Sequence, residues 1–249
     1  MTDENPFQYW RILAWTGPVL LAVTIVFWGV FGQNIPPYSA DLTAEEFAAQ
    51  FIPHAVEIRA GMIVTITFAV FYFTWGLAIT KVMETLERGS NNILSTLQLW
   101  GAGFTTLIFV IPCSIWITAT FRADTLPPST LQIIFDFGWI LFDLAYSLTT
   151  MQMIAIGVCF LQDKRPVPLF PKWLAWFSIW TGLMFFIEVL NPFFKSGPFS
   201  RSGLMNYWIE FSIFFAFMLF ISIWTLKAIT RLQQEHAGHV TGTARLAPA

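Results

Sequence analysis

Two aspartates lie inside a long apolar stretch, and their type and spacing suggest chemistry more than any other residues in the chain. The stretch is Leu131–Leu161, LQIIFDFGWILFDLAYSLTTMQMIAIGVCFL, and it contains Asp136 and Asp143. Residues seven apart project from one face of a helix. Three further polar residues share that face: Gln132, Ser147 and Thr150. Because a carboxylate at the centre of a bilayer costs about 3 kcal/mol on insertion scales, the sequence predicts a polar stripe that the rest of the chain must shield from lipid.

Two glutamates in other apolar runs, Glu188 and Glu210, add to this group. With a rise of about 1.5 Å per helical residue and spans of alternating direction, both fall near the same membrane side as Asp136, while Asp143 lies deeper. The beginning of the second span brings a histidine and an arginine to that side. The candidate ligand- or proton-binding residues are therefore Asp143, Asp136, Glu210, Glu188, Arg59, His54, Tyr72 and Ser147.

Two interpretations of the carboxylates stay open. In the first, they line a polar cavity that opens outward and has Asp143 at its floor, because ionisable groups within a membrane mark functional sites by default. In the second, Glu188, Glu210 and Asp136 only fasten helix ends by pairing with the cations of the same side, which are Arg59, Lys195 and Arg201.

Asp143 differs from the other three carboxylates because no basic residue is expected at its depth. This favours a functional role for Asp143. The alternative is a protonated carboxyl group that is hydrogen-bonded to Ser147 or Tyr72.

Motifs for catalysis, metals and cofactors are missing from the sequence. It contains no G-x-S-x-G, no P-loop, no G-x-G-x-x-G and no C-x-x-C. A metal site made by His54 with the membrane carboxylates is disfavoured, and we assign no catalytic residue, no metal ligand and no cofactor. The two cysteines, Cys113 and Cys159, are expected to be small core residues.

The composition places these residues in a membrane protein. Of the 249 residues, 56% are hydrophobic and 11% are charged, whereas soluble domains carry roughly 25% charged residues. The formal net charge of −2 gives no basic surface for nucleic acid. We expect a lipid bilayer as the environment, with a small or lipidic ligand, a membrane-protein partner or a second copy of the chain as further partners.

Six apolar runs are long enough to cross a bilayer, which needs about 20 residues. We expect an all-α fold in which residues 1–231 form one transmembrane domain and residues 232–249 form a polar, disordered tail. The connection after the first span contains the capping-box pattern T-x-x-E at Thr43 and Glu46, so a short amphipathic helix is predicted there. The expected spans are about 12–31, 60–82, 94–121, 131–161, 173–190 and 204–229.

The basic residues predict the orientation, because cytoplasmic loops are enriched in Lys and Arg. With both termini in the cytoplasm, nine of the 13 cations lie inside: Arg11, Lys81, Arg88, Lys164, Arg165, Lys172, Lys227, Arg231 and Arg245. The predicted location is the inner (plasma) membrane, and the short amphipathic helix then lies in the first outer loop.

Three stretches carry a resemblance: TAEEFAAQFIPHAVEIRAGM, IIFDFGWILFD and PFFKSGPFSRSGLMNYWIE. They resemble a group of bacterial multi-pass membrane proteins to which no activity is assigned. The resemblance covers most of the chain, from about Pro36 to the sixth span. It implies a six-span inner-membrane protein and supplies no catalytic residue.

The leading functional prediction is a non-enzymatic membrane protein that binds or transports a small or lipidic molecule through the outward-facing cavity, with proton coupling through Asp136 and Asp143. The alternative is an accessory or structural subunit of a membrane complex. An intramembrane enzyme that uses Asp136, Glu188, Glu210 and His54 is the third and least favoured class.

Overall fold

The fold is an all-helical bundle. A computed structural model describes residues 5–87 and 91–244, and no strand occurs in these two ranges. Six of the described helices are long and apolar enough to cross a membrane, as the sequence predicts, so the chain is a multi-pass membrane protein. Their bounds are Phe7–Phe31, Ala44–Glu84, Ile93–Phe121, Pro128–Leu161, Lys172–Phe193 and Leu204–Gly238.

These spans are divided into twelve elements. In chain order they are α1 (Pro6–Val23), η1 (Thr24–Phe31), α2 (Ala44–Phe51), η2 (Ile52–His54), α3 (Ala55–Glu84), α4 (Ile93–Phe121), α5 (Pro128–Leu144), α6 (Tyr146–Leu161), α7 (Lys172–Met184), η3 (Phe185–Phe193), η4 (Leu204–Ile209) and α8 (Glu210–Ala244).

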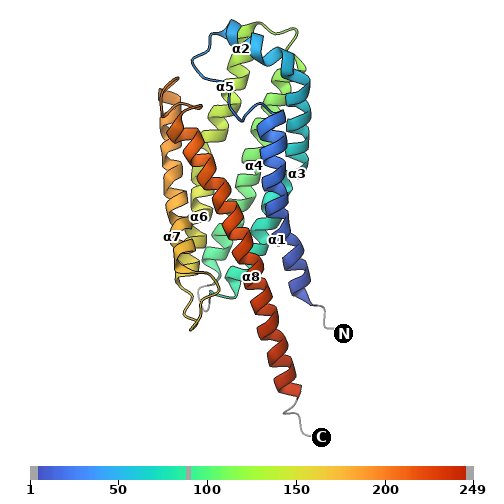
Figure 1. The fold of residues 1–249 in the computed structure, drawn as a ribbon, viewed down its shortest axis with the longest axis vertical. Coiled ribbons are helices and arrows are strands. Elements are labelled where there is room, and N and C mark those ends of the chain that lie inside the picture. The colour runs from blue at the N-terminus through green and yellow to red at the C-terminus, as the bar shows by residue number, and fades with distance from the viewer. Residues whose placement is uncertain (1–4, 88–90, 245–249) are drawn as a thin grey trace.

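The two ends of the bundle differ in what lies there (Figure 1). The short helix α2 lies across one end, which we call the α2 end, and both chain termini lie at the other, the termini end. At the α2 end, Thr43 and Glu46 form the predicted capping box, and Phe47 and Phe51 of α2 are fully buried. The helix α2 thus begins at this capping box and lays its apolar face on the bundle.

Five spans depart from regular α-helix in the half of the bundle nearer to α2, and the second does so through the short 3₁₀ segment η2. The first span ends in a π-helical segment, η1, and the sixth begins with another, η4. The fifth ends in the 3₁₀ segment η3, which contains Pro192. The fourth span, expected as one helix, is broken at Ala145, where φ is −81° and ψ is 4°. Neither Pro nor Gly occurs between residues 139 and 147, so the local sequence does not mark this break.

The buried side chains form two hydrophobic clusters. One is rich in large aromatic residues beneath α2, with Trp28, Trp116 and Trp139 fully or almost fully buried. The other fills the rest of the bundle towards the termini end and includes both Trp75 and Cys159. Cys113 and Cys159 are buried and unpaired, in agreement with their predicted core role.

The last helix is longer than expected. Residues 232–244, predicted as the beginning of a disordered tail, continue α8, whose last turns project past the other helices (Figure 1). Contacts with α1 favour this continuation: Arg11 donates hydrogen bonds to Thr230 and Gln233, and Phe7 packs against His236. Residues 245–249 of that tail, with Arg245, and Arg88 lie outside the described residues.

Candidate functional site

Three membrane carboxylates are buried close together. The exposed fractions of Asp143, Glu188 and Glu210 are 4%, 5% and 2%. Each lies where a helix is irregular: Asp143 is two residues before the break at Ala145, Glu188 is inside η3, and Glu210 is the residue at which η4 gives way to α8. Non-helical backbone at membrane depth is tolerated only where protein or water satisfies it, and here it surrounds the ionisable groups.

Glu188 and Glu210 face each other from the fifth and sixth spans. Their carboxyl groups are close enough to interact with one another, and both line a cavity of about 40 Å³. No donor in the described ranges reaches Oε2 of either residue. Because an ionised carboxylate can only accept hydrogen bonds, a bond between the two groups needs a proton on one of them.

Asp143 has partners that the sequence analysis did not predict. The side-chain amide of Asn191 donates a hydrogen bond to Oδ2 of Asp143, and Arg201 is near enough to interact with it electrostatically. The expectation that no basic residue reaches its depth is therefore wrong, because Arg201 folds back from the loop before η4 and is only 4% exposed.

Among the described residues, the two expected alternative partners of Asp143, Ser147 and Tyr72, form no hydrogen bond with it. Ser147 is exposed, since the break at Ala145 takes it off the face of Asp143. Tyr72 donates its hydroxyl to Oε1 of Gln152 at 3.0 Å. The polar stripe predicted for Leu131–Leu161 is thus continuous from Gln132 to Asp143 only.

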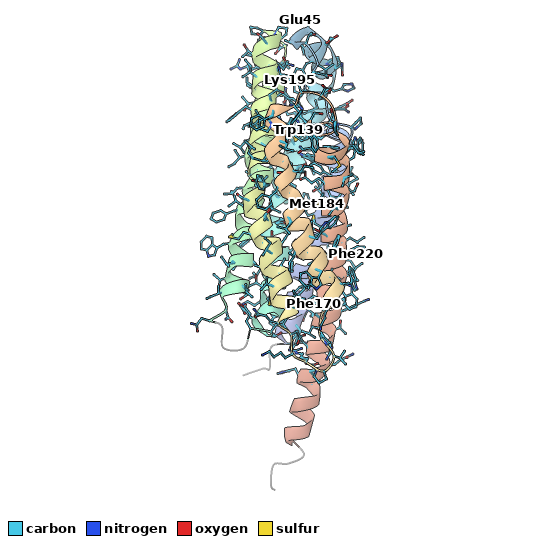
Figure 2. The ribbon with its side chains drawn as sticks, turned by 90° about the vertical axis from the view of Figure 1, so that its left-hand side faces the viewer. Glu45, Trp139, Phe170, Met184, Lys195 and Phe220 are labelled. Atoms are coloured by element: carbon cyan, nitrogen blue, oxygen red, sulfur yellow. The ribbon has the colours of Figure 1, made fainter. Side chains whose placement is uncertain are left out.

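Asp136 forms the mouth of the site. It accepts a hydrogen bond from Nη1 of Arg201 at 2.6 Å, and its side chain is 37% exposed. A pocket of about 110 Å³ lies beside this ion pair and is also lined by Asn191 and Lys195. Asn191 thereby connects the pocket to Asp143. Figure 2 shows Lys195 and Trp139, both of which line the pocket, between Glu45 of α2 and Met184 near the middle of the bundle.

The second interpretation, in which ion pairs fasten helix ends, applies to Asp136 alone. Its pair with Arg201 is present, whereas Glu188 and Glu210 form no salt bridge with Arg59, Lys195 or Arg201. They face each other because the irregular segments η3 and η4 turn both side chains inward.

Arg59 and His54 lie away from the buried carboxylates. Arg59 donates to Oγ1 and the backbone oxygen of Thr120 at 3.2 and 2.5 Å. His54 lies 3.0 Å from Glu57 in an exposed pair. In the described ranges, no group of three or more His, Cys, Asp or Glu is arranged to hold a metal ion.

Residues 32–43 cover the site and are tied to it by side chains. Arg201 Nε donates to the backbone oxygen of Tyr38 at 3.1 Å, and Gln132 Nε2 donates to that of Leu42 at 2.8 Å. The hydroxyl of Tyr207 donates to the backbone oxygen of Asn34. Burial, with a smaller contribution from the charge of Glu57, raises the pKa of Tyr38 to about 12.

Comparison of the chain with models of known families, with curated proteins and with solved structures gave no match. The resemblance to bacterial six-span proteins therefore stays a prediction.

Proposed function

We propose that this protein is a proton-translocating membrane protein, in which Asp143 and the Glu188–Glu210 pair bind and release protons. The observation that carries the proposal is the pair itself: two buried carboxyl groups that line one cavity, interact with one another and form no salt bridge with a cation of the described ranges. Two ionised carboxylates that lie close together repel each other, and in other carboxylate sites such pairs therefore share one proton. A site that must hold one proton and can lose it is suited to proton transfer.

The size of the cavity favours protons and water over larger ligands. A cavity needs about 10–15 Å³ to hold a water molecule, and sites for drug-sized ligands are about 300–1,000 Å³. The cavity at Glu188 and Glu210 is about 40 Å³, which suits water. The pocket at Asp136 and Arg201 is about 110 Å³, so a solute that moves together with the proton would be small. These volumes do not favour a lipidic substrate.

The proposed entry runs through the α2 end. A proton that reaches the exposed edge of Asp136 crosses the pocket that Asn191 lines and arrives at Asp143, whose charge acts on both glutamates. With the termini in the cytoplasm, as the basic residues predict, the α2 end faces the exterior of a plasma membrane. An accessory role beside another membrane protein or a second copy stays an alternative without a specific observation in its favour.

Proton binding can be measured without transport. We expect a pH jump on purified protein in detergent to give an infrared difference band from carboxyl C=O groups, together with proton uptake recorded by a soluble indicator dye. The variant Glu188→Gln/Glu210→Gln should lose most of the band and the corresponding uptake, because amides do not titrate.

The matched control is Glu45→Gln, since Glu45 is an exposed glutamate on α2. It should keep the band. If the band is the same in wild type and in the double variant, the two glutamates do not exchange protons and the proposal is refuted.

A further inference from the structure

Buried polar side chains continue beyond the cavity at Glu188 and Glu210. Its wall also contains Thr105 of α4 and Thr149 of α6, whose hydroxyl oxygens are 3.0 Å apart. Both threonines are buried, at 3% and 4% exposure. A hydroxyl is both a donor and an acceptor, so this pair can pass a proton onward in the direction away from α2.

A second polar pair lies one turn nearer to the termini end. Gln152 is three residues after Thr149 on α6, a spacing that puts both on one helix face, and it accepts a hydrogen bond from Tyr72 of α3. Gln152 and Tyr72 are both fully buried. The pair therefore continues the line of polar groups from the cavity between α3, α4 and α6.

A third pair follows on the same helix faces. Gln98 is seven residues before Thr105 on α4 and accepts a hydrogen bond from Thr80, which is eight residues after Tyr72 on α3. Gly76 and Gly101 bring the three helices together here: a Cβ at Gly76 would lie 3.3 Å from Nε2 of Gln98, and one at Gly101 would lie 2.6 Å from Cβ of Gln152. The second and third pairs are thus in adjacent layers.

The amide nitrogens of Gln98 and Gln152 both indicate that a further hydrogen-bond partner is present. Each is buried, and neither has a hydrogen-bond acceptor in the part of the chain that the structure describes. Buried donors are almost always satisfied by protein or water. A water molecule held by each amide would bridge the steps between the hydroxyl groups.

The line reaches the termini end at Glu87. Gln98 is one helical turn from Ser95, and Glu87 accepts the backbone N–H groups of Leu94 and Ser95 at 2.8 Å each. Glu87 also lines an open pocket with Gln162 and Asp163 at this end. Glu87 is therefore the ionisable group at which the line of polar residues meets solvent.

We infer that the Thr105–Thr149, Tyr72–Gln152 and Thr80–Gln98 pairs form the second half of a proton route, which joins the carboxyl cluster to Glu87 and so connects the two membrane faces. The inference rests on the proposed function. Each hydroxyl and each bridging water accepts a proton on its oxygen and releases another to the next hydroxyl or water, while the amides of Gln98 and Gln152 position the waters and carry no proton. One proton then leaves at Glu87 for each that enters at Asp136.

The test is proton flux in proteoliposomes. A valinomycin-induced potassium diffusion potential drives protons, and an enclosed pH dye records them. We expect Thr105→Val and Tyr72→Phe, which remove a hydroxyl and keep the shape, to lower the flux about tenfold or more, equivalent to at least 1.4 kcal/mol in the barrier.

The control is Thr106→Val, because Thr106 donates its hydroxyl to Ala102 of its own helix and lies off the route. Its flux should match wild type. Retention of the pH-dependent infrared carboxyl band in every variant shows that the site is folded. If wild type conducts protons and the band is intact, but the flux of Thr105→Val and Tyr72→Phe equals that of Thr106→Val, the inference is overturned while the proposed function stands. Absence of proton flux in wild type would overturn both. Loss of the band from wild type would instead remove the proposed function.

Discussion

The two halves of the bundle hold their buried polar groups in different ways. Towards the α2 end the groups are ionisable, lie on irregular helix segments and are reached by long side chains such as that of Arg201. Towards the termini end, apart from Glu87, the groups are neutral, lie on the regular helices α3, α4 and α6, and pair directly across the interface. The halves meet at the cavity lined by Glu188, Glu210, Thr105 and Thr149.

This difference follows from what each kind of group requires. A buried charged group needs several hydrogen-bond or ionic partners, or a proton that neutralises it. The reason is that the free energy of its desolvation exceeds the stabilisation from a single contact. Irregular segments such as η3 and η4 supply the freedom to turn side chains and free backbone groups towards it. A neutral hydroxyl–amide pair needs only one partner, so regular helices suffice if their backbones approach closely. The termini half should therefore depend on backbone packing, and the α2 half on particular side chains.

The largest effect is expected from Gly101→Leu in the termini half. A Cβ at residue 101 would lie 3.0 Å from Cα and 3.1 Å from N of Gln152, so α4 and α6 would have to separate. Overpacking of this kind costs up to about 3 kcal/mol. We expect the free energy of unfolding, measured by SDS titration in mixed micelles, to fall by about that amount.

Gly103→Leu is the matched control for the packing effect. A Cβ at residue 103 meets only the ring of Phe73, at 3.6 Å, and both substitutions add the same side chain to the same helix. Equal losses from the two variants would show that close approach of α4 and α6 does not stabilise the termini half.

A smaller effect is expected from Arg201→Ala in the α2 half. Arg201 pairs with Asp136 at 2.6 Å, donates to the backbone of Tyr38 and lies over the rings of Phe135 and Trp139. Removing one partner of a buried pair costs 3–5 kcal/mol, and because Asp136 is partly exposed we expect about 2 kcal/mol in the same SDS titration.

The control for Arg201→Ala is Lys195→Ala, since Lys195 is an exposed cation beside the same pocket. It should cost little, in keeping with other exposed cations. A double-mutant cycle of Arg201→Ala with Asp136→Asn isolates their coupling. Zero coupling would mean that the ion pair does not hold the α2 half together.

The sequence predicts the spans well and the site only in part. Apolar length identifies all six spans, and T-x-x-E identifies α2, because hydropathy and capping are local properties. Asn191 and Arg201 were missed as partners of Asp143 because they occur in a segment that resembles a loop, and their approach depends on how η3 and η4 fold back.

The neutral pairs were missed for another reason. Each residue of these pairs is an ordinary polar residue when it is considered alone. Only the pairing across three helices distinguishes Thr80, Gln98, Thr105, Thr149 and Gln152. Their spacings of three, seven and eight residues along α6, α4 and α3 were a signal in the sequence, but such a spacing does not reveal the partner helix. The break at Ala145, which separates Ser147 from Asp143, has no sequence signal at all.

The smallest effect is expected from Tyr38→Phe, which tests whether the segment covering the α2 half is bound to it in solution. Because burial raises the pKa of Tyr38 from 10.0 to about 12, the unfolded chain loses this proton at a lower pH than the folded chain. The contribution of Tyr38 to the free energy of unfolding is thus complete below pH 10 and is lost as pH rises towards 12. We expect the free energy of unfolding of wild type to fall more steeply over that interval than that of Tyr38→Phe. Tyr9→Phe, at an exposed position of α1, should leave the wild-type slope unchanged. If the free energy of unfolding falls equally steeply with pH in wild type and in Tyr38→Phe, residues 32–43 leave the bundle in solution. The α2 half would then lack the covering segment that the termini half does not have.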